Sequence, residues 1–112
     1  MKWSELSNNT CPVARTMSLI GDRWTVLIIR DCFLGLSRFD EFQKSTGMTR
    51  HVLSSRLKRL TENGILDRQA YRTRPVRHEY VLTERGKELA PTLSALRDWG
   101  KSHMPVRRFA GV

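Results

Sequence analysis

Acidic residues, cysteines and long apolar runs are all scarce in this chain, and each scarcity excludes a class of protein. The longest strongly apolar run covers residues 26–29, far short of the roughly 20 residues that a membrane-spanning helix needs. The first residues lack the apolar core of a secretory signal, and two cysteines without such a signal favour reduced thiols over a structural disulfide. We therefore expect a cytoplasmic protein that does not enter the membrane.

Clusters of residues that carry catalysis or bind metals are also missing from the sequence. His51, His78 and His103 fall in different predicted elements, and no Cys/His spacing suits zinc. No paired carboxylates and no glycine-rich phosphate loop are evident. The sequence therefore predicts no catalytic residue, no metal site and no cofactor, and its 112 residues allow one domain with a modest core.

Positive charge, by contrast, is abundant and unevenly distributed. The chain has 20 Lys and Arg against 11 Asp and Glu, which gives a formal net charge of +9. Residues 50–78 alone carry eight of these cations and two acids, whereas the segments before and after them have net charges of only +1 and +2. We interpret this block as a surface for nucleic acid, the alternative being an arginine-rich surface that only keeps the protein soluble.

The N-terminal half predicts short helices with clear ends. Residues 1–10 form a polar arm with isolated apolar anchors, and Cys11 is the N-cap of a helix that Gly21 ends near residue 20. Asp22 can cap a second, largely apolar helix that runs to about residue 34. This second helix is expected to form the centre of the core.

A helix-turn-helix follows. Ser37 with Asp40 resembles a capping box that opens a short helix presenting phenylalanines inward, and Gly47 closes it. Thr49 then caps a longer helix to about residue 63. Its apolar stripe consists of Leu53, Leu57 and Leu60, with Gly64 after its end.

The outer face of this longer helix supplies candidates for DNA contact. A step of 100° per residue places His51, Ser55 and Lys58 opposite Leu53, with Ser54 about a quarter turn away. Free amide groups at the helix start favour a phosphate beside Thr49 and Arg50. Arg50, His51 and Lys58 taken one at a time are almost equally well explained as an ordinary solvated face, and their combination with the turn and the basic hairpin favours DNA contact.

A basic hairpin comes next. Residues 65–72 and 79–82 predict two paired strands, joined by a turn that contains Pro75. Three arginines without an intervening acid would repel one another unless a polyanion were bound. The predicted DNA-binding residues of the whole chain are Arg38, Thr49, Arg50, His51, Ser54, Ser55, Lys58, Arg72, Arg74 and Arg77.

The C-terminal part predicts a helix capped by Thr83 that Pro91 kinks or breaks. Its apolar face either packs on its own subunit or contacts a partner, and different residues can do each. From residue 105 onward we expect a frayed tail.

Several motifs together resemble a known family. They are Cys11-Pro12-Val13-Ala14, Ile20-Gly21-Asp22-Arg23-Trp24-Thr25-Val26-Leu27, Arg38-Phe39-Asp40-Glu41-Phe42, Leu53-Ser54-Ser55-Arg56-Leu57, Gly64-Ile65-Leu66, Glu79-Tyr80, and Leu82-Thr83-Glu84-Arg85-Gly86. This pattern is similar to the HxlR family of bacterial transcription regulators, relatives of the MarR group. The resemblance implies a mainly α, α+β winged helix-turn-helix at residues 11–104, with a two-stranded wing and dimerisation helices at both ends.

The resemblance further implies a homodimer that binds a palindromic operator in double-stranded DNA. The helix at 49–63 would enter the major groove, and the wing at 74–78 would reach the minor groove. Candidate dimer contacts are Trp3, Leu6, Val13, Leu89, Leu93, Leu96 and Trp99. The alternative is a winged-helix module that binds RNA or a protein without operator specificity.

Cys11 matches a cysteine that senses oxidants, quinones or aldehydes in some family members. A thiolate at a helix N-terminus is stabilised by the dipole and the free amides, which supports a reactive role. The equally strong alternative is an inert cap or interface residue. Cys32 lies in an apolar helix, where we expect burial to raise its pKa, and whether a small molecule or oxidant controls the protein stays open.

Overall fold

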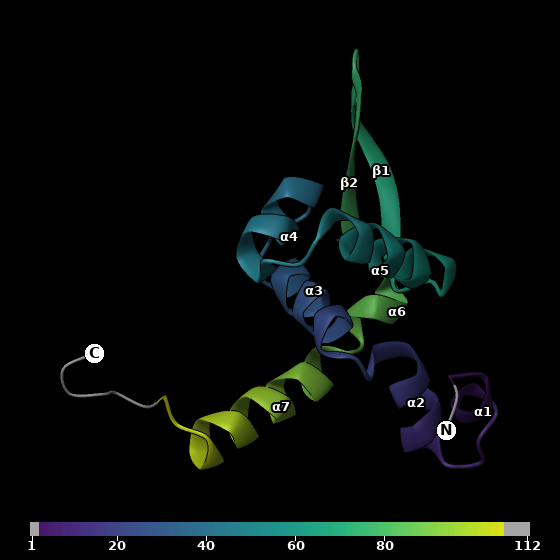
Figure 1. The fold of residues 1–112 in the computed structure, drawn as a ribbon, viewed down its shortest axis with the longest axis vertical. Helices are drawn as coiled ribbons and strands as arrows, with labels where there is room; N and C mark the ends of the chain where they lie inside the picture. Colours follow the sequence, from purple (N-terminus) through teal and green to yellow (C-terminus); the bar gives the residue numbers. More distant parts are fainter. Residues whose placement is uncertain (1–2, 107–112) are drawn as a thin grey trace.

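The computed structural model describes residues 3–106 and confirms a mainly helical winged helix-turn-helix fold. The elements run in order along the ribbon of Figure 1. They are α1 (Trp3–Ser7), α2 (Pro12–Ile20), α3 (Arg23–Phe33), α4 (Phe39–Thr46), α5 (Arg50–Glu62), β1 (Leu66–Thr73), β2 (Val76–Leu82), α6 (Glu84–Lys87) and α7 (Ala90–His103).

Helix α3 lies at the centre of the core, as predicted. It packs against α2, α4, α5 and β2, and its Ile28 and Ile29 have no exposed surface. Asp22 caps it by accepting hydrogen bonds from the amides of Trp24 and Thr25 at 3.0 Å. The buried apolar side chains are Ile20, Ile28, Ile29, Phe42, Met48, Leu53, Leu57, Leu60, Ile65 and Leu66. Burying each such side chain contributes about 1.5–3 kcal/mol, so this cluster is the main source of stability.

The start of α4 differs from the sequence prediction by one residue. The expected pair of Ser37 and Asp40 does not form the capping box. Instead the Glu41 carboxylate accepts the amides of Arg38 at 2.9 Å and Ser37 at 3.1 Å, and these bonds lower its pKa. Because the helix starts at Phe39, the third helical position is Glu41, whose longer side chain reaches back to both amides.

Helix α5 follows its sequence signals closely. The Thr49 hydroxyl accepts the Val52 amide at 3.2 Å, and its leucine stripe is buried against α3 and α4. Gly64 adopts a φ of +74° just beyond the helix, a conformation that strains residues with a Cβ atom. This turn sends the chain directly into β1, so α5 and the wing are held next to each other.

The wing is a two-stranded antiparallel hairpin. Leu66 pairs with Leu82 at its base and Thr73 with Val76 at its tip, which leaves Arg74 and Pro75 in the turn. Strand β2 therefore begins at Val76, three residues earlier than predicted, because pairing with β1 extends it beyond its apolar part. A shift of register at Tyr71 marks a β-bulge.

The helical stretch after the wing is broken, as predicted. Helix α6 ends at Lys87, and Pro91 lies in the first turn of α7, where its missing N–H removes no helical bond. The predicted arm at 1–10 contains the short helix α1, which packs on α2. The predicted frayed tail at 105–112 lies mostly outside the described residues.

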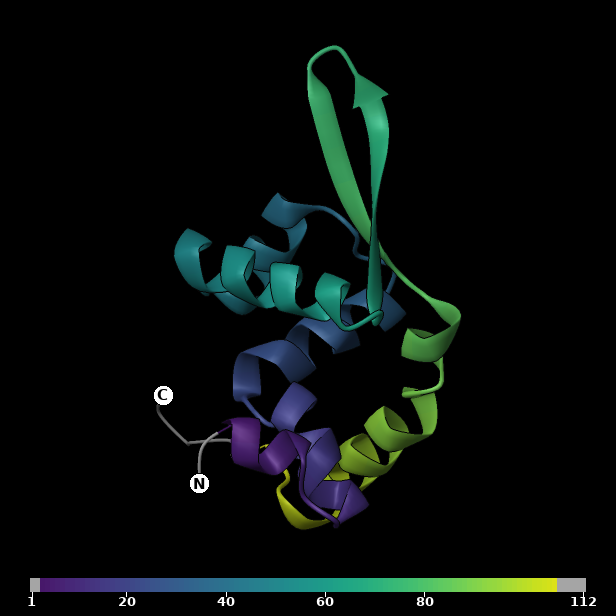
Figure 2. The same cartoon turned by 90° about the vertical axis from the view of Figure 1, so that its right-hand side faces the viewer.

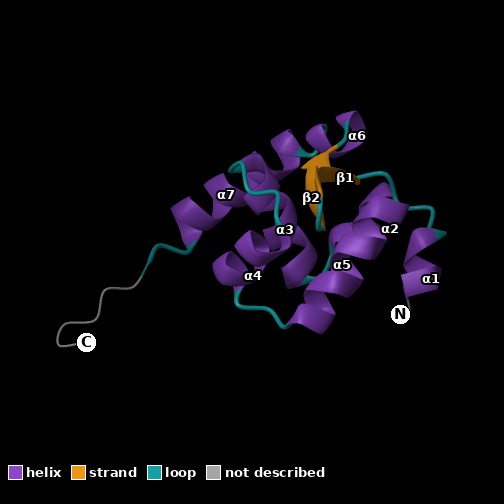
Figure 3. Cartoon of the chain, turned by 90° about the horizontal axis from the view of Figure 1, so that it is seen from above, coloured by secondary structure: helices purple, strands orange, loops and turns teal. Residues whose placement is uncertain are grey.

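The helices and the wing are divided between two ends of the molecule. In Figures 1 and 2 the wing rises from the end of the molecule that carries α4 and α5, whereas α1, α2 and α7 form the opposite end. Seen from above, α7 projects on one side and α1 with α2 on the other (Figure 3). Within the described residues, no helix is long and apolar enough to cross a membrane.

Candidate nucleic-acid interface

The outer face of α5 is open to solvent. Its inner stripe of leucines fixes the helix rotation, so His51, Ser54 and Ser55 are all exposed, as the helical geometry predicted. Lys58 is 78% exposed and lies 3.9 Å from Glu62, a surface pair that restrains it little. Arg50 is exposed at the helix start. The face thus combines small polar residues with exposed cations, which suits close approach to base edges and phosphates.

Two cations of α5 face the body of the protein instead. The Arg56 Nε lies 3.3 Å from the Asp22 carboxylate, and the Arg59 guanidinium donates to the Ser18 carbonyl. Burial alone would raise the pKa of Asp22, but hydrogen bonds from Thr25 and Arg56 outweigh it and lower that pKa. These contacts tie α5 to α2 and to the start of α3, so part of the basic block serves the fold.

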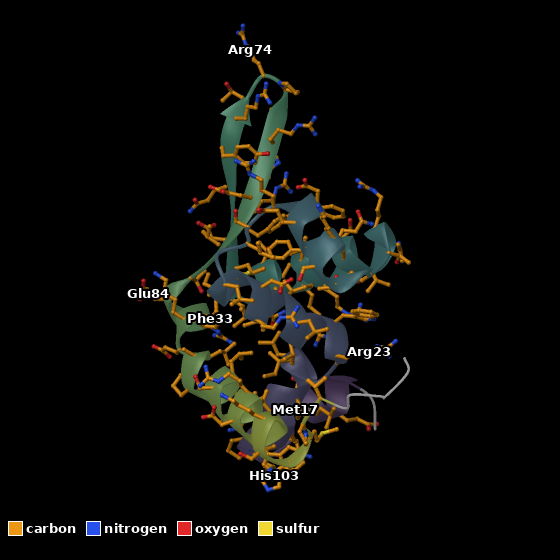
Figure 4. All side chains as sticks on the ribbon, turned by 90° about the vertical axis from the view of Figure 1, so that its left-hand side faces the viewer. Met17, Arg23, Phe33, Arg74, Glu84 and His103 are labelled. Carbon is orange, nitrogen blue, oxygen red and sulfur yellow. The ribbon has the colours of Figure 1, made fainter. Side chains whose placement is uncertain are left out.

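The wing presents its predicted arginines to solvent. Arg72, Arg74 and Arg77 are exposed, and Arg72 lies directly opposite Arg77 across the two strands. Like charges in that position are unfavourable in the free protein. Arg74 lies at the tip of the wing, far from His103 at the other end of the molecule (Figure 4). The outer wing is therefore a concentrated positive site that an anion would stabilise.

The start of α4 is joined to the base of the wing. The Tyr80 amide donates to the Ser37 carbonyl at 2.7 Å, and the Ser37 hydroxyl donates to the Glu79 carboxylate at 3.1 Å. Arg38 stacks on Tyr71, with its guanidinium carbon 4.1 Å from the ring centroid. Sequence reasoning selected Arg38 but missed Tyr71. An aromatic residue inside a basic hairpin was the only available signal, because the pairing joins distant parts of the chain.

The two cysteines have opposite environments. Cys11 is exposed at the N-cap of α2 and makes no capping hydrogen bond through its side chain, but the nearby amides of Ala14 and Val13 favour the thiolate and lower its pKa. Burial raises the pKa of Cys32 to about 12, and Asp31 adds to the effect. The expectation for Cys32 is confirmed, and Cys11 stays a candidate for a reactive thiol.

The predicted dimer residues lie at the end opposite the wing. Leu89 and Leu93 are half-buried against the core of their own subunit, whereas Leu96 and Trp99 are 52% and 58% exposed. An open groove of about 530 Å³ runs between α3 and α7. On the α1–α2 side, Val13 is exposed and Leu6 is half-buried, and Trp3 begins α1. Exposed apolar surface therefore gathers at this end.

Acidic, cysteine and histidine side chains are the groups that most often bind metal ions in proteins. Within residues 3–106, no group of three or more such residues could hold a metal ion. The predicted DNA-binding residues, by contrast, come together at one end of the molecule, on α5, the wing and the start of α4.

Comparison with known proteins gives these features a family context. The profile of the HxlR-like helix-turn-helix family matches residues 19–108. A relative that is 44% identical over 93 residues is an uncharacterized HTH-type transcriptional regulator of Mycobacterium bovis. The aligned part covers 83% of this chain and 59% of that protein, so the chain spans about three fifths of the relative's length.

Solved structures extend the similarity to the whole fold. The crystal structure of PA1607 matches with a TM-score of 0.85 and 40% identity, covering 97% of this chain and 75% of the other. The redox regulator HypR in its oxidized form matches with a TM-score of 0.78 and 34% identity, covering 86% of this chain and 100% of the other. Both matches include most of each chain compared.

Proposed function

Because this chain belongs to the HxlR-like helix-turn-helix family, we propose that this transcriptional regulator binds a palindromic DNA operator by sequence, as a homodimer. The observation that carries the proposal is the joint exposure of the polar face of α5 and the arginines of the wing at one end of the molecule. This role is one of binding rather than of catalysis. In a bacterial cell, the source of the relative named above, a protein that acts on chromosomal DNA would work in the cytoplasm.

Helix α5 would lie in the major groove. Ser54 and Ser55 are small enough to let the helix approach the base edges, while His51 or Arg50 can reach a guanine or the backbone. Thr49 and the free amides of the first turn would face a phosphate. The wing would carry Arg74 and its neighbours into the adjacent minor groove.

A second subunit would complete the DNA-binding surface. A two-fold operator requires two recognition helices about 34 Å apart, one turn of DNA. The exposed Leu96 and Trp99 on α7, with Val13 on α2, supply apolar surface at the end away from the wing. Pairing through that end would leave both copies of α5 and both wings free for one duplex.

Selection of duplexes from a random-sequence library by the purified protein tests this proposal. We expect an enriched palindrome that binds at least a hundredfold more tightly than its scrambled version, measured by fluorescence anisotropy. Equal affinity for both duplexes would refute the proposal and favour the phosphate-dominated binding of a module without operator specificity.

A lysine substitution probes the recognition face directly. Lys58→Ala should weaken binding to every duplex and lower the salt slope by about one unit if Lys58 meets a phosphate. Lys101→Ala on α7 removes the same charge at the other end and should change neither quantity. A loss confined to one base position would instead make Lys58 a reader of sequence.

We also propose that Cys11 makes DNA binding sensitive to oxidants or electrophiles. Its exposure and lowered pKa support this role, and a structural relative, HypR, is named a redox regulator. Cys11→Ser should keep DNA affinity but abolish the response to diamide or a quinone, whereas Cys32→Ala should respond like the wild type. An unchanged response in Cys11→Ser would refute this role.

A further inference from the structure

Two adjoining recesses lie between α5 and the wing. The first, of about 570 Å³, lies where the start of α4 meets both strands. The second, of about 560 Å³, continues along the outer face of α5 beside β1. Phe39, Arg50 and Tyr80 line both recesses. Together they form a path that crosses the molecule between the recognition helix and the wing.

Two arginines along this path are held by aromatic rings. Arg38 stacks on Tyr71 at 4.1 Å, and Arg50 stacks on Phe39 at 4.7 Å, measured from guanidinium carbon to ring centroid. Within the described part of the chain, neither arginine is in a salt bridge. A guanidinium whose face lies on a ring keeps the N–H donors of its edge available for an anion.

The backbone of the wing is irregular at the residue that stacks on Arg38. Ala70 pairs with His78 and Arg72 with Arg77, so Tyr71 is the extra residue of the bulge. A bulge re-aims a side chain out of the regular alternation of a strand. An isolated antiparallel β-bridge, formed by backbone hydrogen bonds, pairs Arg38 with Glu79 and holds the start of α4 beside β2. The ring and its arginine are therefore fixed by two separate elements before any ligand arrives.

The charge of the first recess fits a phosphate. Arg38, Arg50 and Arg77 line it, and Asp40 is the one acidic residue among the described residues that do so. In duplex DNA a single sugar–phosphate strand separates a major groove from the adjacent minor groove. A protein with α5 in one groove and the wing in the other must therefore pass that strand through the space between them.

We propose that the stacked Arg38 and Arg50 clamp this intervening backbone strand, and that Tyr71 positions Arg38 for a specific phosphate. The inference rests on the proposed DNA-binding function and assigns a new role to a residue that does not itself read bases. Tyr71 acts through Arg38, because its ring fixes the guanidinium before DNA binds and reduces the ordering cost of the contact.

The test combines ring variants with modified DNA. The probe is the duplex selected by the wild-type protein, together with copies in which single phosphates are replaced by uncharged methylphosphonates. Wild-type protein should lose affinity at one or two adjacent phosphates between the groove contacts. Tyr71→Leu, which removes the ring but keeps apolar bulk, should bind the unmodified duplex about three- to tenfold more weakly and lose its sensitivity at those positions.

Matched variants separate positioning from a structural role. Tyr71→Phe keeps the ring and should behave like the wild type, whereas Arg38→Ala should reproduce Tyr71→Leu. The double variant should bind no more weakly than Arg38→Ala alone, because the ring has no other role in the contact.

Two results would overturn the inference. The first is a Tyr71→Leu protein that keeps the wild-type sensitivity at every phosphate. The second is a uniform loss at all phosphates together with a lower melting temperature, which would make Tyr71 a residue of wing stability only. Wild-type protein that selects no duplex would refute the proposed function instead, so the two failures are distinguishable.

Discussion

Helices α5 and α7 carry similar leucine patterns and have opposite surroundings. Leu53, Leu57 and Leu60 of α5 are 0–1% exposed, whereas Leu96 and Trp99 of α7 are 52% and 58% exposed. No residue of α7 is buried. The difference shows that helical periodicity identifies an apolar face but does not tell which chain covers it. In α5 the whole face is buried within the subunit, whereas in α7 Leu93 packs on the core and Leu96 and Trp99 stay exposed.

The largest effect should come from truncating the buried stripe. Leu57→Ala removes a side chain that is 1% exposed, and the resulting cavity should lower the free energy of unfolding by about 2–5 kcal/mol. Urea denaturation followed by circular dichroism measures this change. Leu96→Ala is the matched control on α7 and should cost much less at protein concentrations where the subunit is monomeric. Equal losses of unfolding free energy in Leu57→Ala and Leu96→Ala would show that the leucines of α5 and α7 contribute equally to the stability of the subunit.

A smaller effect is expected from the exposed face of α7. Trp99→Ser should leave the subunit folded but raise the dimer dissociation constant about thirtyfold or more, which corresponds to the roughly 2 kcal/mol of a tryptophan hot spot. Sedimentation velocity across a dilution series measures the constant, with Lys101→Ala on the same helix as control. An unchanged constant for Trp99→Ser would show that this face is not the dimer contact.

Local signals made much of the fold predictable. Asp22 and Thr49 each accept the amides that an N-cap residue accepts, and Gly64 takes the left-handed conformation that ends α5. These features depend on residues within one helical turn, so the sequence alone contains them. The exposure of the outer face of α5 follows from the same periodicity.

Non-local contacts account for what was missed. The outer half of β2 and the bulge at Tyr71 depend on pairing between strands, and the stacking of Arg38 on Tyr71 joins α4 to the wing. The one-residue error at α4 had a different cause, since adjacent acids at Asp40 and Glu41 both suit a helix start. The helix begins at Phe39, so Glu41 and not Asp40 is the third helical residue, whose side chain reaches the amide of the N-cap residue.

The smallest predicted effect concerns the polar contacts that join α5 to α2 and to the start of α3. Asp22 caps α3 and also pairs with Arg56 of α5, so Asp22→Ala should cost about 0.5–2 kcal/mol at neutral pH. Asp22→Asn should cost less, because asparagine also caps helices but cannot form the ion pair. Urea denaturation of both variants measures these costs.

The pH dependence of the stability lost in Asp22→Ala and Asp22→Asn separates the contribution of the helix cap from that of the ion pair. Because the pKa of Asp22 is lowered in the folded state, its charge contributes stability that is fully present above the unfolded pKa of about 3.9 and is lost as the pH falls through the folded pKa. The difference between wild type and Asp22→Asn should therefore be constant near neutral pH and shrink in acid below about pH 4. A difference that persists unchanged to pH 2 would mean that the charge of Asp22 does not stabilise the fold, and the ion pair with Arg56 would then add nothing to the packing that holds α5.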